Sequence, residues 1–223
     1  MTRPDLAFEV NELSKSILNA KIRDLKSAKR LVEKAKLETA ILKFTNLGPI
    51  EDLRIKLYCD ASFNNQDSKL RPTEGRVLLL EYTYSDIENM FFWKIKRISR
   101  ICRSVKGAET RALENGLDEA VHYARMVKEI YDGGANIKNP KQIKVEAVTD
   151  NKGLWENLNN TRQCEEKMLR NFIASEKKMV EKSEVEKVYW VETKGMLADT
   201  LTKIAGNGSW VKDVVERNRT YDN

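Results

Sequence analysis

The order of the hydrophobic patterns along the chain restricts its fold more than any other feature. Three successive segments, at residues 54–60, 75–82 and 91–98, have the short apolar or alternating pattern of strands. Loops connect them, which predicts an antiparallel meander. Two further strand patterns, at residues 144–150 and 185–191, alternate with helical patterns at residues 107–131, 152–158, 165–182 and 197–203. We therefore expect an α/β fold with a mixed five-stranded sheet flanked by helices.

Two of the expected helices have a continuous apolar face. In residues 107–131 the inward side chains are Leu113, Leu117, Ala120, Ala124, Val127 and Ile130. In residues 165–182 the inward side chains are Met168, Leu169, Phe172, Ile173 and Met179. Gly133 and Gly134 are expected to end the first of these helices, because glycine is favoured just past helix C-termini.

An N-terminal segment, residues 4–46, is expected to be helical and to precede the sheet. Its apolar residues recur every three or four positions, and Gly48 and Pro49 separate it from the first strand. Residues 21–36 contain seven basic and two acidic side chains. Two interpretations of this basic helix remain open at this point, a solvated face and a contact with nucleic-acid phosphates.

The composition excludes several kinds of chemistry. The chain has one histidine, His122, and three isolated cysteines, Cys59, Cys102 and Cys164, so neither a Cys/His zinc site nor a disulfide framework is expected. A Ser/His/Asp triad would have to use His122, and no Gly-x-Ser-x-Gly turn accompanies it. Phosphate-binding glycine loops are also absent from the sequence. If the chain is an enzyme, its chemistry is expected to depend on carboxylates.

Charge and hydropathy bear on location and partners. The sequence contains 40 Lys and Arg against 34 Asp and Glu, a net charge of +6, which fits a nucleic-acid partner without requiring one. No apolar run reaches the roughly 18 residues that a membrane span needs, so no membrane partner is expected. The N-terminal residues lack the apolar core of a secretion signal, so secretion is not expected either.

Four acidic residues stand at positions where the expected strands and helices begin or end. Asp60 and Asp150 each follow an apolar strand, Glu109 lies near the start of the long helix, and Asp199 lies in the final helix. Neighbouring strand ends can meet at one edge of a mixed sheet, where α/β proteins bind ligands. Two interpretations stay open. Such acids often serve as helix caps, and a cluster of them could instead hold two Mg²⁺ ions about 4 Å apart for phosphodiester hydrolysis.

The four acidic segments occur, in the same order, in a known family. Residues 58–62 (YCDAS), 108–113 (AETRAL), 149–152 (TDNK) and 197–203 (LADTLTK) resemble the C/Y-x-D-A-D/S, A-E-x-x-A-L, D-N and L-A-D-x-L-T-K motifs of the ribonuclease H domain in copia-type retrotransposon polyproteins. Residues 92–94 (FWK) are similar to part of the I-S-W-x-S-K-K strand of that family. The resemblance implies a ribonuclease H-like fold.

The N-terminal segment resembles the same polyproteins. Residues 2–14 (TRPDLAFEVNELS) are similar to the T-R-P-D-I-x-x-x-V-x-x-L-S motif that follows the polymerase palm. The resemblance implies that residues 1–48 are a thumb or connection remnant of a reverse transcriptase, residues 49–205 a ribonuclease H-like domain and residues 206–223 a C-terminal tail. The polymerase Y-x-D-D motif does not occur in this sequence, so no polymerase activity is expected.

The sequence departs from the family pattern in three places. The serine-rich S-S-T-E-A-E-Y segment is replaced by residues 103–110 (RSVKGAET), and residues 161–164 (TRQC) stand near the place of the family's T-K-H-I-D segment. Trp190 occupies the position where the H-V-x-T strand has histidine. None of these changes removes one of the four acids.

By resemblance, the four acids Asp60, Glu109, Asp150 and Asp199 are both the catalytic residues and the ligands of two Mg²⁺ ions, with Mn²⁺ as a substitute. The implied reaction is hydrolysis of the RNA strand of an RNA–DNA hybrid, recognised by its 2′-hydroxyl groups. The implied partners are that hybrid and the upstream reverse transcriptase segment, and self-association through the N-terminal helices is a further expectation. The implied location is intracellular, in the cytoplasm within a virus-like particle or in the nucleus.

Six basic residues between positions 94 and 106 are candidates for binding phosphates: Lys94, Lys96, Arg97, Arg100, Arg103 and Lys106. A basic edge strand that is protected from aggregation is an equally good interpretation of this group. Two alternatives to the enzyme also remain, a non-catalytic nucleic-acid-binding or dimerisation remnant of a retroelement, and a structural connection domain.

Overall fold

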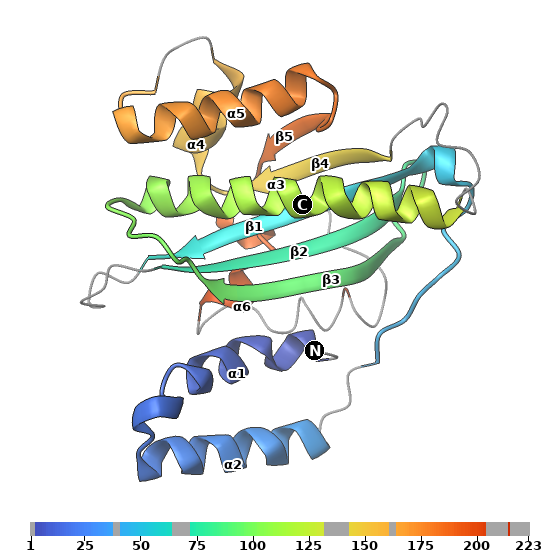
Figure 1. The fold of residues 1–223 in the computed structure, drawn as a ribbon. Coiled ribbons are helices and arrows are strands. Elements are labelled where there is room, and N and C mark those ends of the chain that lie inside the picture. Colours follow the sequence, from blue (N-terminus) through green and yellow to red (C-terminus); the bar gives the residue numbers. More distant parts are fainter. Residues whose placement is uncertain are drawn as a thin grey trace.

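A five-stranded sheet forms the centre of the molecule (Figure 1). The computed structural model describes residues 3–37, 41–63, 72–131, 143–160, 164–203 and 214. The strands are β1 (Leu53–Ser62), β2 (Thr73–Tyr82), β3 (Glu88–Arg97), β4 (Lys144–Thr149) and β5 (Lys187–Trp190), in the order β3-β2-β1-β4-β5. The pairs β1–β2 and β2–β3 are antiparallel, and the pairs β1–β4 and β4–β5 are parallel. This is the mixed, ribonuclease H-like arrangement expected from the sequence.

One face of the sheet is covered by the long helix α3 (Val105–Tyr131), with α4 (Lys152–Asn159) and α5 (Arg170–Glu181) beside it (Figure 1). Strand side chains such as Ile55 and Leu57 pack there against Leu113 and Leu117 of α3. α5 follows a short 3-10 turn, Lys167–Leu169, and contributes Ile173 to this core. Because alternate strand residues point to opposite faces, the residues between them are left for the other side of the sheet.

The opposite face carries a smaller core next to the C-terminal helix α6 (Asp199–Thr202). Tyr58, Val77 and Leu79 of the sheet pack there with Leu197 and Leu201. The apolar residues around α6 therefore fix this one-turn helix against the sheet.

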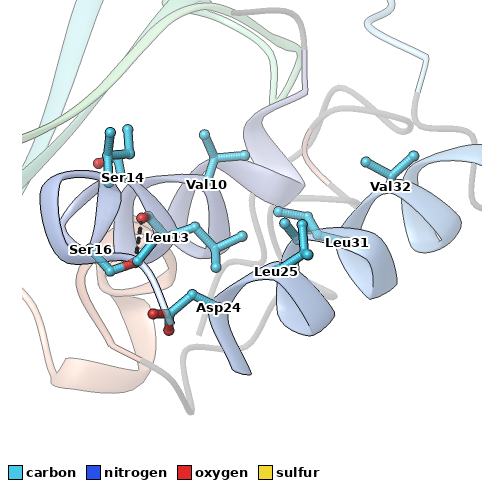
Figure 2. Close-up of a pocket in the computed structure, with 11 residues that line it drawn as sticks. Val10, Leu13, Ser14, Ser16, Asp24, Leu25, Leu31 and Val32 are labelled. Atoms are coloured by element: carbon cyan, nitrogen blue, oxygen red, sulfur yellow. Dashed lines mark hydrogen bonds between the residues drawn. The ribbon is translucent and has the colours of Figure 1, made fainter. Parts of the chain in front are cut away.

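Two helices at the N-terminus, α1 (Ala7–Ser14) and α2 (Ile22–Leu37), lie on this second side of the sheet (Figure 1). α1 contacts β3 and α6, and Ala7 is buried in the smaller core. None of the residues of α2 is buried, and Leu25 remains 71% exposed. The two helices enclose an open apolar hollow of about 440 Å³ (Figure 2).

Several expected boundaries and burial assignments are wrong. Residues 41–46 are not helical, because the Asn89 side chain bonds to both the N–H and the C=O of Thr45 and so satisfies backbone groups of this extended segment. Met168 is 70% exposed because it lies in the 3-10 turn before α5, off its helical face. Ile130 is also 70% exposed, because it lies in the last turn of α3, at the edge of the sheet.

The other expected elements are confirmed within a few residues at each end. Gly133 and Gly134, residues 161–163 and the proposed tail 206–223 apart from Val214 lie outside the described residues. No helix in the described part of the chain is long and apolar enough to cross a membrane.

Candidate active site

Asp60 and Asp150 meet at one edge of the sheet because β1 and β4 run parallel. Tyr58 on β1 pairs with Val148 on β4, so the residues two positions further on, Asp60 and Asp150, are neighbours. Asp60 is still within β1 and is 1% exposed, whereas Asp150 follows the end of β4 and is half-buried. The parallel register, which no local pattern specifies, thus places both carboxylates at the ligand-binding edge of the sheet.

α6 brings a third carboxylate to this edge. Asp199 is the first residue of α6, and the Thr202 hydroxyl at its other end donates to Oδ2 of Asp60. The close approach requires Gly75, which lies opposite Asp60 on β2. A Cβ atom at position 75 would lie 2.7 Å from Thr202 Cγ2 and 2.9 Å from Leu201 Cβ. A glycine on the neighbouring strand therefore makes room for the helix that completes the site.

The geometry of the three aspartates fits a metal ion. One carboxylate oxygen from each of Asp60, Asp150 and Asp199 lies within 4.8 Å of the others. Oδ1 of Asp60 is buried and accepts no hydrogen bond from any residue that the structure describes. A buried carboxylate oxygen without a donor is costly unless a cation approaches it, and oxygen ligands are those that Mg²⁺ and Mn²⁺ prefer.

Glu109 faces the same site from α3 but lies outside this close group of three. It is 5% exposed. Burial raises its pKa well above the usual range, and the charges of Asp60 and Asp150 raise it further, against a backbone hydrogen bond from Ala61. The hydrogen bond from Ala61, the residue after Asp60, places Glu109 beside the end of β1.

The pKa values of the aspartates reflect the same crowding. Burial raises the pKa of Asp199 to about 6, with added contributions from Asp60 and Asp150 and an opposing one from Lys203. Burial, followed by the charge of Asp60, also raises the pKa of Asp150. The acids of the site are therefore short of positive charge.

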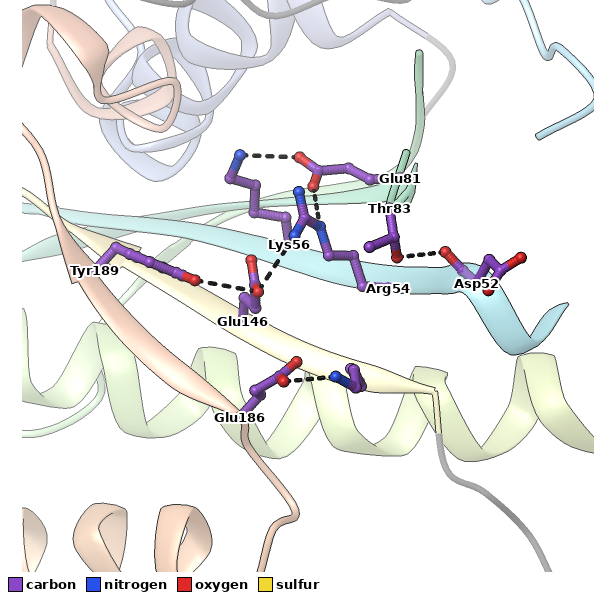
Figure 3. Close-up of polar contacts among 9 residues, drawn as sticks. Asp52, Arg54, Lys56, Glu81, Thr83, Glu146, Glu186 and Tyr189 are labelled. Carbon is purple, nitrogen blue, oxygen red and sulfur yellow. Dashed lines mark hydrogen bonds and ion pairs between the residues drawn. The ribbon is translucent and has the colours of Figure 1, made fainter. Parts of the chain in front are cut away.

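A second acidic group on the same sheet face provides a comparison (Figure 3). Glu81 lies 2.7 Å from Arg54 Nε and 3.0 Å from Lys56 Nζ. Although burial raises the pKa of Glu81, these cations and the hydrogen bonds around it lower the pKa overall. Glu146 in turn accepts from the Tyr189 hydroxyl at 3.2 Å. Glu81 is thus held by two cations, whereas Asp60 and Asp199 share the single ammonium group of Lys203 among the described residues.

Three further residues contact the site acids. The Thr193 hydroxyl donates to Oδ2 of Asp150 at 3.1 Å, and the Trp190 indole N–H donates to the Asp150 carbonyl at 3.0 Å. Lys203 Nζ lies 2.6 Å from Oδ1 of Asp199 and 3.6 Å from Oδ1 of Asp60. Sequence reasoning missed these roles, although Lys203 closes the LADTLTK segment and Trp190 and Thr193 belong to the last strand motif.

Asn151, which follows Asp150, has a different role. Its side chain accepts from the Leu154 N–H at 2.9 Å and so caps α4. In this Asp-Asn pair, the first residue belongs to the site and the second caps the helix that follows.

The six predicted phosphate-binding residues do not share one face. Lys94 is on the α3 side of β3 and pairs with Glu119, whereas Arg97 points to the other side because side chains alternate along a strand. Arg100 and Arg103 are exposed in the connection between β3 and α3, and Lys106 is half-buried in the first turn of α3. Of the six, Lys106 is the nearest in sequence to a site acid, since it lies one helical turn before Glu109.

Comparisons with known proteins give matches of fold. No family model matches the sequence, and no curated protein matches it. The N-terminal RNase H domain of a Mycobacterium tuberculosis protein has 18% identity over 67% of this chain and 91% of its own, with a TM-score of 0.46. LC11-RNase H1, isolated from compost, has 14% identity over 70% and 97%, with a TM-score of 0.47.

RNase H1 from the archaeon Halobacterium salinarum has 16% identity over 72% of this chain and 98% of its own, with a TM-score of 0.44. A further structure of LC11-RNase H1 is a complex with an RNA/DNA hybrid. Likenesses at this level of identity and score do not decide the chemistry of this chain, which has to be argued from its own site.

Proposed function

We propose that this protein is a ribonuclease H that hydrolyses the RNA strand of RNA–DNA hybrids with two divalent metal ions. The observation that carries the proposal is the group of three carboxylate oxygens within 4.8 Å of one another, together with the buried Oδ1 of Asp60, which accepts no hydrogen bond from the described residues. Glu81 has two cations in ion-pair contact, whereas the single ammonium group of Lys203 is shared by Asp60 and Asp199 among the described residues. The Asp60 site therefore has more carboxylates than cations, as expected where a cation is to bind.

Each acid has a distinct part in the proposed mechanism. Asp60 and Asp150 would hold both metal ions, Glu109 would hold one of them on the side of the attacking water, and Asp199 would complete the second. Bound divalent ions supply an activated water and stabilise the leaving 3′-oxygen. The Thr202 hydroxyl keeps Oδ2 of Asp60 occupied, and Thr193 bonds to Asp150, so the remaining carboxylate oxygens would be the ones left to hold the metals.

The proposed substrate follows from charge and from the resemblance. The motif order implies a hybrid duplex, which a nuclease distinguishes by 2′-hydroxyl groups across the minor groove. Arg100, Arg103 and Lys106 lead from the edge strand to the helix that carries Glu109, so phosphates bound there would run toward the acids. Lys94, Lys96 and Arg97 are proposed to extend that contact along β3.

The origin of the chain is part of the proposal. The LADTLTK and TRPDL segments support descent from the C-terminal part of a copia-type pol polyprotein. In that setting the ribonuclease H would work inside the cell, next to an upstream reverse transcriptase segment, and would degrade RNA that has been copied.

A cleavage assay tests the function. End-labelled RNA–DNA hybrid, duplex RNA and duplex DNA are incubated with the full chain and Mg²⁺ or Mn²⁺. We expect cleavage of the RNA strand of the hybrid alone. Asp150→Asn keeps the size of the side chain but removes its charge and should lower the rate by at least about 100-fold, because a metal ligand is lost.

Asp86→Asn is the matched control and should leave the rate unchanged, because Asp86 lies in the exposed turn after β2, at the opposite end of that strand from Gly75, the partner of Asp60. Equal rates for Asp150→Asn and the unmodified chain would rule out the proposed metal site. Tight hybrid binding without cleavage in either metal would favour the non-catalytic remnant instead.

A further inference from the structure

Lys203 follows the end of α6 and contacts two of the site aspartates, not only the one on its own helix. Its ammonium group lies 2.6 Å from Oδ1 of Asp199 and 3.6 Å from Oδ1 of Asp60. The Asp60 atom is the buried oxygen that accepts no hydrogen bond among the described residues. Lys203 thus approaches the same oxygen that identifies the candidate metal site.

The lysine acts electrostatically on the whole group of acids. Its charge opposes the upward pKa shifts of Asp150, Asp199 and Glu109, which lie on three different elements. Glu81 has two cations in ion-pair contact, whereas Lys203 is the one cation of the described residues that pairs with Asp60 and Asp199. Carboxylates gathered without a counter-charge repel one another, so Lys203 is the group that lets them remain together.

From this geometry we propose that Lys203 is an internal counter-ion, which occupies the position of a divalent cation in the metal-free site and leaves it when metal binds. The proposal rests on the metal site of the proposed function. Lys203 is a positioning residue in this scheme, since it holds the carboxylates close together before loading and competes with the metal for their oxygens.

The surroundings of Lys203 allow such an exchange. Its side chain is 41% exposed, while that of Asp60 is 1% exposed, so the lysine reaches in from solvent rather than being enclosed. Lys203 is the residue that follows the last residue of α6, so its long side chain can swing away without unwinding the helix. The 3.6 Å distance to Asp60 also leaves that oxygen without a hydrogen bond to give up.

Mn²⁺ binding to the full chain tests the inference without using activity. Free Mn²⁺ is measured by electron paramagnetic resonance for the unmodified chain, Lys203→Met, Lys203→Arg and the control Lys194→Met. Lys194 is exposed and belongs to the neighbouring turn. Lys203→Met should bind Mn²⁺ about tenfold more tightly because a competing positive charge is gone. Lys203→Arg and Lys194→Met should stay within about twofold of the unmodified chain, since both keep the charge near Asp60.

Thermal unfolding supplies a second readout. Without metal, Lys203→Met should unfold at a lower temperature than the unmodified chain, because the carboxylates then repel one another. At saturating Mn²⁺ this difference should disappear, because the metal has taken over the role of the lysine. A helix-end ion pair with no other role would lower stability equally with and without metal. Lys203→Gln repeats both measurements with a polar side chain should Lys203→Met fail to fold.

The possible failures are distinguishable. If neither the unmodified chain nor any variant binds Mn²⁺, the metal site is wrong and the proposed function fails together with the inference. If the unmodified chain binds Mn²⁺ but Lys203→Met binds it equally or more weakly, the inference about Lys203 is overturned and the metal site stands.

Discussion

At the scale of single residues, the buried carboxylates differ in their partners, and this difference indicates which of them are structural. Glu176 on α5 is a third kind, apart from the paired Glu81 and the site acids. It is 1% exposed, and neither of its oxygens accepts a hydrogen bond within the described chain. Burial raises its pKa well above the usual range near 4.5, and the nearby charge of Glu114 raises it further. Glu176 is therefore a carboxyl group that the folded protein prefers to keep protonated.

This preference predicts a pH dependence of stability. The folded pKa of Glu176 lies above its unfolded value, so its contribution is greatest at low pH and declines as pH rises from about 4.5 through the raised pKa. Glu176→Gln should increase the free energy of unfolding at pH 8 by about 1–2 kcal/mol and should flatten this decline. Urea unfolding of both proteins between pH 5 and about pH 8 measures the effect.

Glu181→Gln, on the exposed end of the same helix, is the control and should leave the profile unchanged. An unchanged pH profile for Glu176→Gln would mean that the carboxylate is ionised and solvated in the folded protein, contrary to its burial.

At the scale of elements, α6 is too short to be stable alone and depends on the strand beneath it. A helix of one turn has almost no intrinsic stability, so its position comes from packing. It is fixed by Leu201 in the smaller core, by the Thr202 bond to Asp60 and by the space above Gly75. The geometry of the proposed site and the packing of α6 therefore depend on the same contacts.

Gly75→Ala tests this dependence. The new Cβ would meet Thr202 and Leu201 at less than 3 Å, so α6 has to move and Asp199 with it. We expect a loss of about 1–3 kcal/mol of stability and a loss of hybrid cleavage of at least about tenfold. Denaturant unfolding and the cleavage assay measure the two quantities.

Gly116→Ala on α3 is the matched control, because its Cβ would meet Leu57 Cδ2 at 2.9 Å in the other core. It should destabilise the protein by a similar amount and leave the turnover of folded enzyme intact. Equal loss of turnover in both variants would show that activity depends on packing in general and not on the position of α6.

The sequence predicts the elements well where one physical pattern dominates. The strands are short apolar or alternating runs, and the 27-residue α3 has a long stretch of helical period, so both stand out. The spacing predicts the burial of Met168 wrongly, because the apolar pattern continues through a turn that is not α-helical. Residues 41–46 were misjudged because a distant side chain, Asn89, satisfies their backbone.

At the scale of the whole molecule, two separate groups of basic residues are candidates for binding a hybrid. One follows β3 into α3, and the other covers α2, none of whose residues is buried. The first set leads to the acids, whereas the second lies on helices on the far side of the sheet from α3 (Figure 1). The two groups therefore predict different binding faces for a hybrid.

Salt dependence of hybrid binding separates these sets. Each lost phosphate contact reduces the slope of log K against log salt by about 0.9 for a duplex. The double variant Arg100→Ser/Arg103→Ser should reduce the slope by about 2, whereas Lys26→Ser/Lys29→Ser on α2 should leave it unchanged. Fluorescence anisotropy between low and moderate salt measures it, with the catalytic Asp150→Asn background to prevent cleavage.

A lower slope for Lys26→Ser/Lys29→Ser and an unchanged slope for Arg100→Ser/Arg103→Ser would mean that α2 contacts the phosphates. A slope near zero in the unmodified chain would remove the phosphate-contact interpretation for both sets.

The candidate site could be predicted only in part. The four acids stand out because they are polar residues at the ends of apolar segments. Their supports do not, since Thr202, Thr193 and Lys203 acquire roles only through contacts with residues distant in sequence. Gly75 illustrates the reason, because its importance comes from the register with Asp60 and from a helix more than a hundred residues later in the chain.

The contact between Asp60 and Thr202 spans 142 residues, and this bears on how the protein is made. During synthesis the first strands leave the ribosome long before α6 does, and they can pair while the chain is still growing. Long-range contacts of this kind also form late, because a large loop has to close first. Asp199 therefore joins Asp60 and Asp150 only once the last helix has been translated and docked. A growing chain would therefore lack the third carboxylate of the proposed metal site, and the hydroxyl that donates to Asp60, until α6 has docked.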